Sequence, residues 1–164
     1  MAFKKTTIAL ALVAGLGVAA GALAHELKGP MPKTAAGKAA WARHDNFKKQ
    51  GGAFKAINDE LKKDSPDMKL IATNAVTLKT TASQLPSWFP KGSGPESKVN
   101  TDAKPEIWTD AAGFSAAANR LQVESSKLQA LAAAGDLNGV KAQARVTGGA
   151  CKNCHDKFRV PEEK

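Results

Sequence analysis

The chain contains little cysteine and shows no pattern typical of a β-sheet. Only two of its 164 residues are cysteine, Cys151 and Cys154, so no disulfide framework competes for their thiols. No stretch alternates β-branched with polar residues, which argues against strands. The apolar run over residues 7–22 is short for a membrane span. These absences favour a helical chain whose two thiols belong to a single motif.

That motif is the run from Cys151 to His155, in which two residues separate the thiols and histidine follows at once. The pattern is the attachment signature of c-type haem. Each thiol forms a thioether bond to a haem vinyl group, and the adjacent imidazole can bind the iron as proximal ligand. A zinc site would need an unusual ligand set that includes a distant histidine. A thioredoxin-like pair would follow a strand. We therefore predict one covalent haem c.

The first residues are typical of a secretory leader. Lys4 and Lys5 precede the apolar run, and the small-x-small sequence 22–24 ends it. We predict a signal peptide over residues 1–24, cleaved after Ala24, and a single mature domain over residues 25–164 without a membrane span. Attachment of c-type haem is completed outside the cytoplasmic membrane in bacteria, so both signals indicate the periplasm.

The chain is basic, with 24 Lys and Arg against 15 Asp and Glu and a net charge of +9. Removal of Lys4 and Lys5 with the leader lowers the charge to +7, because 22 basic residues then face the same 15 acids. The lysines are scattered among acidic residues and form no dense block. This pattern predicts solvated helix faces that steer anionic partners, and it does not favour nucleic acid.

Apolar residues recur with helical spacing in four segments, residues 34–63, 65–85, 105–135 and 136–158. In the first, Phe47, Phe54 and Leu61 stand seven residues apart. We expect Ser65 to cap the second helix, and Gly135 with Asp136 to separate the third from the fourth. The segments predict an all-α protein, an antiparallel up-down four-helix bundle.

Two features between and within these helices concern the cofactor. The crossover loop, residues 86–104, contains Trp88 and Phe89, which we expect to fold back over a buried surface or the haem edge. Gly51-Gly52 and Gly148-Gly149 lie inside predicted helices, where glycine weakens the helix by roughly 1 kcal/mol relative to alanine. Close approach of a flat ring would explain both pairs; a tolerated local weakness would equally explain the first.

Four local patterns together resemble the cytochrome c prime family, the high-spin class II c-type cytochromes. They are Arg43-x-x-x-Phe47, the loop from Leu85-Pro86 to Pro90, the run from Pro105-Glu106-Ile107-Trp108 to Phe114, and Cys151-Lys152-x-Cys154-His155-Asp156-x-x-Arg159. The resemblance covers nearly all of the predicted mature chain. It implies the same bundle, with haem c attached through the last helix.

The resemblance also implies roles for single residues. Cys151 and Cys154 attach the haem, and His155 is its axial ligand. Phe47 covers the distal face; because its ring has no lone pair to donate, the iron should be five-coordinate and high-spin. The family pattern makes Arg43 a partner of a haem propionate. It places Arg159 beside the proximal histidine, where such a residue influences arriving ligands, and puts Phe158 where the family often has tyrosine.

The resemblance implies that the protein binds nitric oxide and carbon monoxide, with an apolar distal pocket that gives bound oxygen no hydrogen bond. It also implies electron transfer with a redox partner protein, and a homodimer. The alternative is a dedicated low-spin electron-transfer cytochrome with a sixth protein ligand; His44, one helical turn before Phe47, is the candidate. We do not expect an enzyme, since Phe47 takes the place of a distal acid-base pair.

Overall fold

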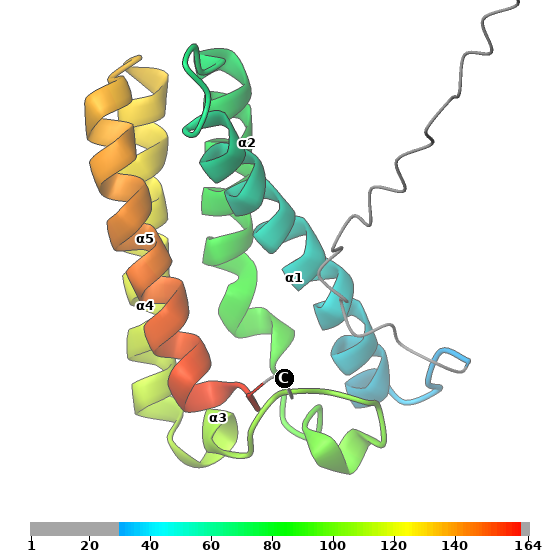
Figure 1. Ribbon diagram of the computed structural model, residues 1–164. Coiled ribbons are helices and arrows are strands. Elements are labelled where there is room, and N and C mark those ends of the chain that lie inside the picture. The colour runs from blue at the N-terminus through cyan, green and yellow to red at the C-terminus, as the bar shows by residue number, and fades with distance from the viewer. Residues whose placement is uncertain (1–29, 162–164) are drawn as a thin grey trace, which may run out of the picture.

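The computed structural model describes residues 30–161 and confirms an all-α bundle (Figure 1). Its long helices are α1 Ala35–Glu60, α2 Met68–Gln84, α4 Ala111–Ala133 and α5 Leu137–Phe158. The short elements are the 3₁₀ helices Leu85–Trp88 and Pro95–Ser97, and α3 Glu106–Thr109. Within residues 30–161 the only β pairing is an isolated bridge between Ala103 and Arg159. The predicted signal peptide, residues 1–24, lies outside the described residues.

The four long helices run alternately up and down (Figure 1). Helix α1 packs against α2, α2 against α4, and α4 against α5. The first and last helices, α1 and α5, are therefore antiparallel, and Phe54 of α1 reaches Gly148 of α5: a Cβ placed on that glycine would lie 3.5 Å from the Phe54 ring. Among the described helices none combines the length and apolar character needed to cross a membrane.

Two hydrophobic clusters fill the bundle. The predicted stripe of the second helix is buried throughout, because its apolar residues recur every three or four positions and so share one face. It consists of Ile71, Ala75, Leu78 and Ala82 of α2 and Leu85 of the 3₁₀ helix that follows. One cluster surrounds Ile57, Leu78, Leu128 and Val140. The other cluster joins the ends of α2, α4 and α5 to the crossover loop, and it includes Leu85, Trp88, Phe114, Leu121 and Phe158. The second cluster borders the haem motif.

The helix ends follow side-chain capping, with two corrections to the sequence prediction. The cap of α2 is Asp67, whose Oδ1 accepts from the amides of Lys69 at 2.9 Å and Leu70 at 3.0 Å; the expectation for Ser65 was wrong. The predicted third helix is divided, because Asp110 leaves helical geometry and caps α4 by accepting from Gly113. The end of α4 is as expected: Gly135 has φ +72°, and Asp136 caps α5.

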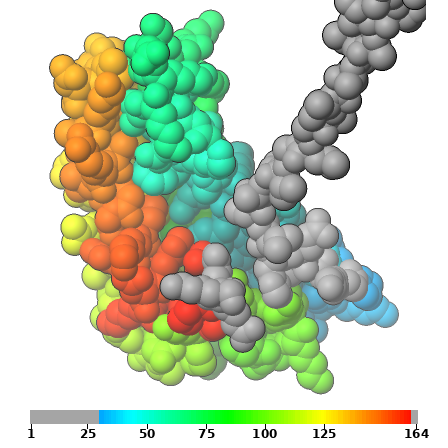
Figure 2. Space-filling model, viewed as in Figure 1, coloured from blue at the N-terminus to red at the C-terminus, as the bar shows by residue number. Residues whose placement is uncertain are grey.

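The crossover loop folds back onto the C-terminal end of α5, and in Figure 2 the red end of that helix and the green loop lie at the same end of the molecule. The Lys104 amide donates to the Phe158 carbonyl at 3.0 Å, and the Val160 amide donates to the Asp102 carbonyl at 2.8 Å. Trp88 is buried, so the expectation that the loop aromatics cover a buried surface is confirmed. The loop thereby closes the end of the bundle that carries the haem motif.

Candidate haem site

The haem motif occupies the last two turns of α5. Cys151 and Cys154 are partly buried and pack against the cluster that contains Trp88 and Phe114, while His155 is exposed. Phe47 of α1 packs against the same cluster. The helix therefore turns both thiols toward one apolar surface and places the imidazole directly after them, as the attachment signature requires.

Both thiols are held in the protonated form. Burial, and after it the neighbouring Cys154, raises the pKa of Cys151 to about 11, and burial also raises the pKa of Cys154. Disulfide exchange proceeds through a thiolate, which this apolar setting disfavours. No group of three or more His, Cys, Asp or Glu side chains within residues 30–161 is arranged to hold a metal ion. Thioether attachment, in contrast, leaves no charge on the sulfur atoms.

The facing surfaces of α1 and α5 have the shape that a flat group needs. Phe54 lies opposite Gly148; since the helices are antiparallel and rise equally per residue, Phe47 stands level with the end of the motif. Gly51 lies one turn beyond Phe47 on α1. A Cβ at Gly149 of α5 would meet nothing within 4 Å; Gly51 and Gly52 have the same open space, but both are exposed, so it does not distinguish a haem from solvent. Two thiols and a histidine on α5, with Gly148 and Gly149 before them and Phe47 against the same cluster, therefore fit a haem.

A chain of edge-to-face aromatic contacts connects α1 with α5. The ring centroids of Phe47 and Trp88 are 5.2 Å apart at 84°, and those of Phe47 and Phe89 are 6.1 Å apart. Phe89 contacts Phe114 at 4.9 Å, and Phe114 contacts Phe158 at 5.5 Å. Each such pair contributes roughly 0.5–1.5 kcal/mol beyond area burial. These contacts fix the orientation of the Phe47 ring beside the haem motif.

Arg43 is buried, with 3% of its surface exposed, and it binds the crossover loop. Its Nη1 donates to the Trp88 carbonyl at 3.3 Å and to Ser93 Oγ at 3.1 Å. Its Nη2 donates to the Ser93 carbonyl and to Thr101 Oγ1, both at 2.9 Å. The guanidinium also lies 4.5 Å from the centroid of the Phe89 ring. Burial lowers the pKa of Arg43 to about 10, against the attraction of Glu96, so the side chain stays charged at neutral pH.

The structure thus gives Arg43 a function that the sequence did not reveal. Its four bonds run to a loop about fifty residues away, and only its Nε–H is not engaged by them. The contact with a haem propionate stays a prediction. Arg159 follows the last residue of α5. Its backbone amide donates to the His155 carbonyl at 3.0 Å, and Arg159 forms the isolated β-bridge with Ala103. Arg159 is therefore held one turn from His155.

His44 lies on α1 next to Arg43, with 21% of its side chain exposed. Its Nδ1 is 3.4 Å from Asp45 Oδ1. The histidine and the ring of Phe47 thus come from adjacent turns of one helix, and it is Phe47 that packs into the cluster beside the two cysteines.

Gln50 is a residue of this region that the sequence reasoning missed. It stands on the stripe formed by Phe47, Phe54 and Ile57 of α1, and only 6% of its surface is exposed. Its Oε1 has no hydrogen-bond partner among the described residues. The available signal was a glutamine at a position of the stripe where the spacing calls for an apolar side chain.

Known proteins agree with this geometry. The profile of the cytochrome c' family matches residues 32–159. The chain belongs to the cytochrome c' family. Cytochrome c' of Rubrivivax gelatinosus is 46% identical over 94 residues, which are 57% of this chain and 70% of that protein. Cytochrome c-556 of Agrobacterium tumefaciens is 28% identical over 123 residues, 74% of this chain and 94% of that protein.

Solved cytochrome c' structures share the bundle. The crystal structure from Rubrivivax gelatinosus aligns with a TM-score of 0.69 at 35% identity, covering 76% of this chain and 96% of that one. A ferrous variant of the Alcaligenes xylosoxidans protein with bound NO aligns with a TM-score of 0.70 at 30% identity, covering 77% and 97%. Another variant of that protein has carbon monoxide bound. The family is one of c-type haem proteins, and this chain has the two cysteines needed for attachment.

Proposed function

We propose that this cytochrome c' is a periplasmic haem protein that binds nitric oxide and carbon monoxide. Cys151 and Cys154 would hold one haem c covalently, and His155 would be the axial ligand of its iron. When bound, the haem supplies an iron atom with one open position for a small gas. One observation carries the proposal: both thiols face the same apolar cluster as Phe47 of the opposite helix, in a bundle whose relatives bind these gases.

Phe47 would keep the sixth position free of protein ligands. Its ring has no lone pair, and the contacts with Trp88 and Phe89 keep it beside the motif. A five-coordinate, high-spin iron follows. The contact between His44 and Asp45 supports this assignment, because it draws the imidazole toward its neighbour on α1. If His44 bound the iron instead, the protein would be a dedicated low-spin electron-transfer cytochrome.

Further properties follow from the same proposal. The iron can change oxidation state, so the protein would be capable of electron transfer, and the basic surface of the chain suits a redox partner with acidic residues. We expect a homodimer, export to the periplasm through residues 1–24, and no enzymatic activity. Arg159, one turn from His155, would act on ligands that reach the proximal side.

The proposal is tested on the purified protein in two steps. The mass of the denatured chain is expected to exceed that of residues 25–164 by one haem, since thioether bonds survive denaturation. The ferrous protein is then titrated with carbon monoxide, and one gas molecule per chain is expected to bind. Absence of covalent haem, or a ferrous protein that takes up no carbon monoxide, would overturn the proposal.

A further inference from the structure

Gln50 is a buried polar side chain whose hydrogen bonding is incomplete. Its residue is 94% buried, and Oε1 is the one buried side-chain nitrogen or oxygen atom of the described part of the chain that lacks a partner. Buried polar groups are hydrogen-bonded in the great majority of cases, because an unsatisfied group loses its bonds to water without replacement. A persistent exception therefore needs a specific reason.

The other buried polar side chains of the bundle are satisfied by their own helices or by neighbouring ones. The hydroxyl of Thr81 donates to the Thr77 carbonyl at 2.9 Å, that of Ser125 to the Gln122 carbonyl at 3.1 Å, and that of Thr147 to the Gln143 carbonyl at 2.9 Å. Glu60 accepts from Lys63 and from the amide of Asp67. Gln50 differs from all of these, because its Oε1 has no partner among the described residues.

The position of Gln50 places it at the haem motif. It lies three residues after Phe47 and four before Phe54, so the three side chains share one side of α1. Phe54 is opposite Gly148 of the antiparallel α5. One turn back along α1 corresponds to one turn forward along α5, which brings Gln50 level with Cys151. By this register Gln50 lies at about the height of the first thiol along the bundle, on the helix that carries Phe47.

Resting on the proposed function, we propose that Gln50 is the hydrogen-bonding residue of the gas pocket on the α1 side of the haem. A carboxamide contains both a donor and an acceptor, and a half-turn of its terminal torsion exchanges Oε1 with Nε2. The Nε2–H can therefore donate to the terminal oxygen of nitric oxide or carbon monoxide. The pocket is then not wholly apolar, and it favours diatomic ligands that carry a hydrogen-bond acceptor.

The test uses the intact haem protein with carbon monoxide as the probe, and compares the wild type with Gln50→Met. Methionine matches glutamine in length and removes the hydrogen-bonding atoms, but its thioether can bind haem iron. Gln50→Leu, which adds no ligand atom, is therefore measured beside it, and both variants should give the same result. The matched control is Gln122→Met, at an exposed position of α4. The measurements are the C–O stretching frequency of the ferrous carbonyl protein and the rate at which carbon monoxide dissociates.

A hydrogen bond to the ligand oxygen lowers the C–O stretching frequency, so Gln50→Met should raise it. Dissociation should become roughly fivefold faster, the size expected for one net hydrogen bond. Gln122→Met should change neither quantity. The thermal midpoint of ligand-free Gln50→Met should equal or exceed that of the wild type, because the variant removes an unpartnered buried atom.

Two results would overturn the inference, and they are distinguishable. If the wild type and Gln50→Met bind carbon monoxide with the same stretching frequency and dissociation rate, Gln50 does not contact the ligand, while the proposed function stands. If the wild-type ferrous protein fails to bind carbon monoxide, the proposed function is wrong and the assignment of Gln50 is wrong with it.

Discussion

Arg43 on α1 donates a hydrogen bond from Nη2 to the carbonyl oxygen of Ser93 at 2.9 Å, across 50 positions of the chain. The same guanidinium holds the Trp88 carbonyl, and Trp88 in turn contacts the ring of Phe47. Arg43 and Phe47 stand one turn apart on α1. A single buried cation therefore fixes the loop that presses the aromatic rings against the haem motif.

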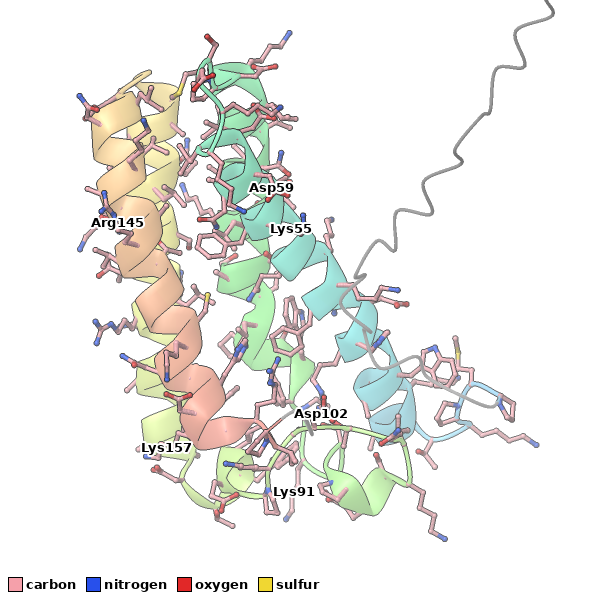
Figure 3. The ribbon with its side chains drawn as sticks, in the orientation of Figure 1. Lys55, Asp59, Lys91, Asp102, Arg145 and Lys157 are labelled. Atoms are coloured by element: carbon pink, nitrogen blue, oxygen red, sulfur yellow. The ribbon has the colours of Figure 1, made fainter. Side chains whose placement is uncertain are left out.

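Replacing Arg43 with methionine should destabilise the protein and loosen the crossover loop. The variant leaves the buried acceptors of Trp88 and Ser93, and the partly buried hydroxyl of Thr101, without their donor, which we expect to cost about 2–4 kcal/mol. Chemical denaturation measures the loss. The control is Arg145→Met, because Figure 3 shows Arg145 on the outer side of α5 and its residue is exposed. Equal stability of the two variants would contradict the role of Arg43 in holding the crossover loop against α1.

The sequence predicted the helices well because each is amphipathic with helical spacing. The stripe from Ile71 to Leu85 is buried as expected, and Gly135 and Asp136 separate α4 from α5 as their local chemistry requires. The two errors concern capping. Asp67 and Asp110 each accept from nearby backbone amides, and such competition between neighbouring capping residues cannot be judged from spacing alone.

The site was predicted less completely, because part of it depends on contacts between distant segments. The spacing of Cys151, Cys154 and His155 is a local pattern that can be recognised in the sequence. The bonds of Arg43 to Ser93 and Thr101 join α1 to the crossover loop and require the fold. Gln50 occupies a position of the apolar stripe in the sequence, but only the fold shows that its Oε1 is buried without a partner among the described residues.

Replacing Phe47 with a smaller side chain should raise the rate at which gases reach the haem. Phe47→Leu removes atoms beside the proposed open position, so the association rate of carbon monoxide should rise, as flash photolysis would show. The control is Phe114→Leu, which alters the same aromatic chain at α4. Each substitution should lower stability by about 1 kcal/mol. A rise of similar size in both variants would mean that general loosening, and not Phe47, controls gas entry.

Each cysteine should form its thioether bond to the haem independently of the other. Cys151→Ser or Cys154→Ser leaves one thioether bond, whereas the double variant should lose all covalent haem. Mass spectrometry of the denatured protein detects each case. Lys152 lies between the cysteines at an exposed position, so the control variant Lys152→Ser should keep both thioether bonds. Covalent haem in the double variant would exclude these cysteines as the attachment points.

Asp110 and Lys157 connect the start of α4 to the haem helix, with 2.5 Å between Oδ2 and Nζ. The hydrogen bond from Lys157, followed by that from the Gly113 amide, lowers the pKa of Asp110 below its ordinary value of 3.8. The folded state therefore favours the carboxylate. Its contribution to stability is present above that value and is lost as the pH falls through the lowered pKa.

Asp110→Asn keeps a capping side chain but removes the charge, so it tests this pair. The wild type should unfold at a higher temperature than the variant at neutral pH, and the difference should disappear as the pH falls through the lowered pKa of Asp110 and the carboxylate becomes protonated. Lys157→Met should reproduce the effect. A difference between wild type and Asp110→Asn that persists unchanged in acid would assign it to capping geometry instead of charge.

The absorption spectrum of the purified ferrous protein, before and after nitric oxide and carbon monoxide, tests the open iron position most directly. We predict a broad high-spin spectrum that shifts with both gases, because Phe47 can donate no ligand atom. Sharp low-spin bands that neither gas alters would contradict the account. They would show a sixth protein ligand, for which His44 is the candidate, and would make electron transfer the leading function.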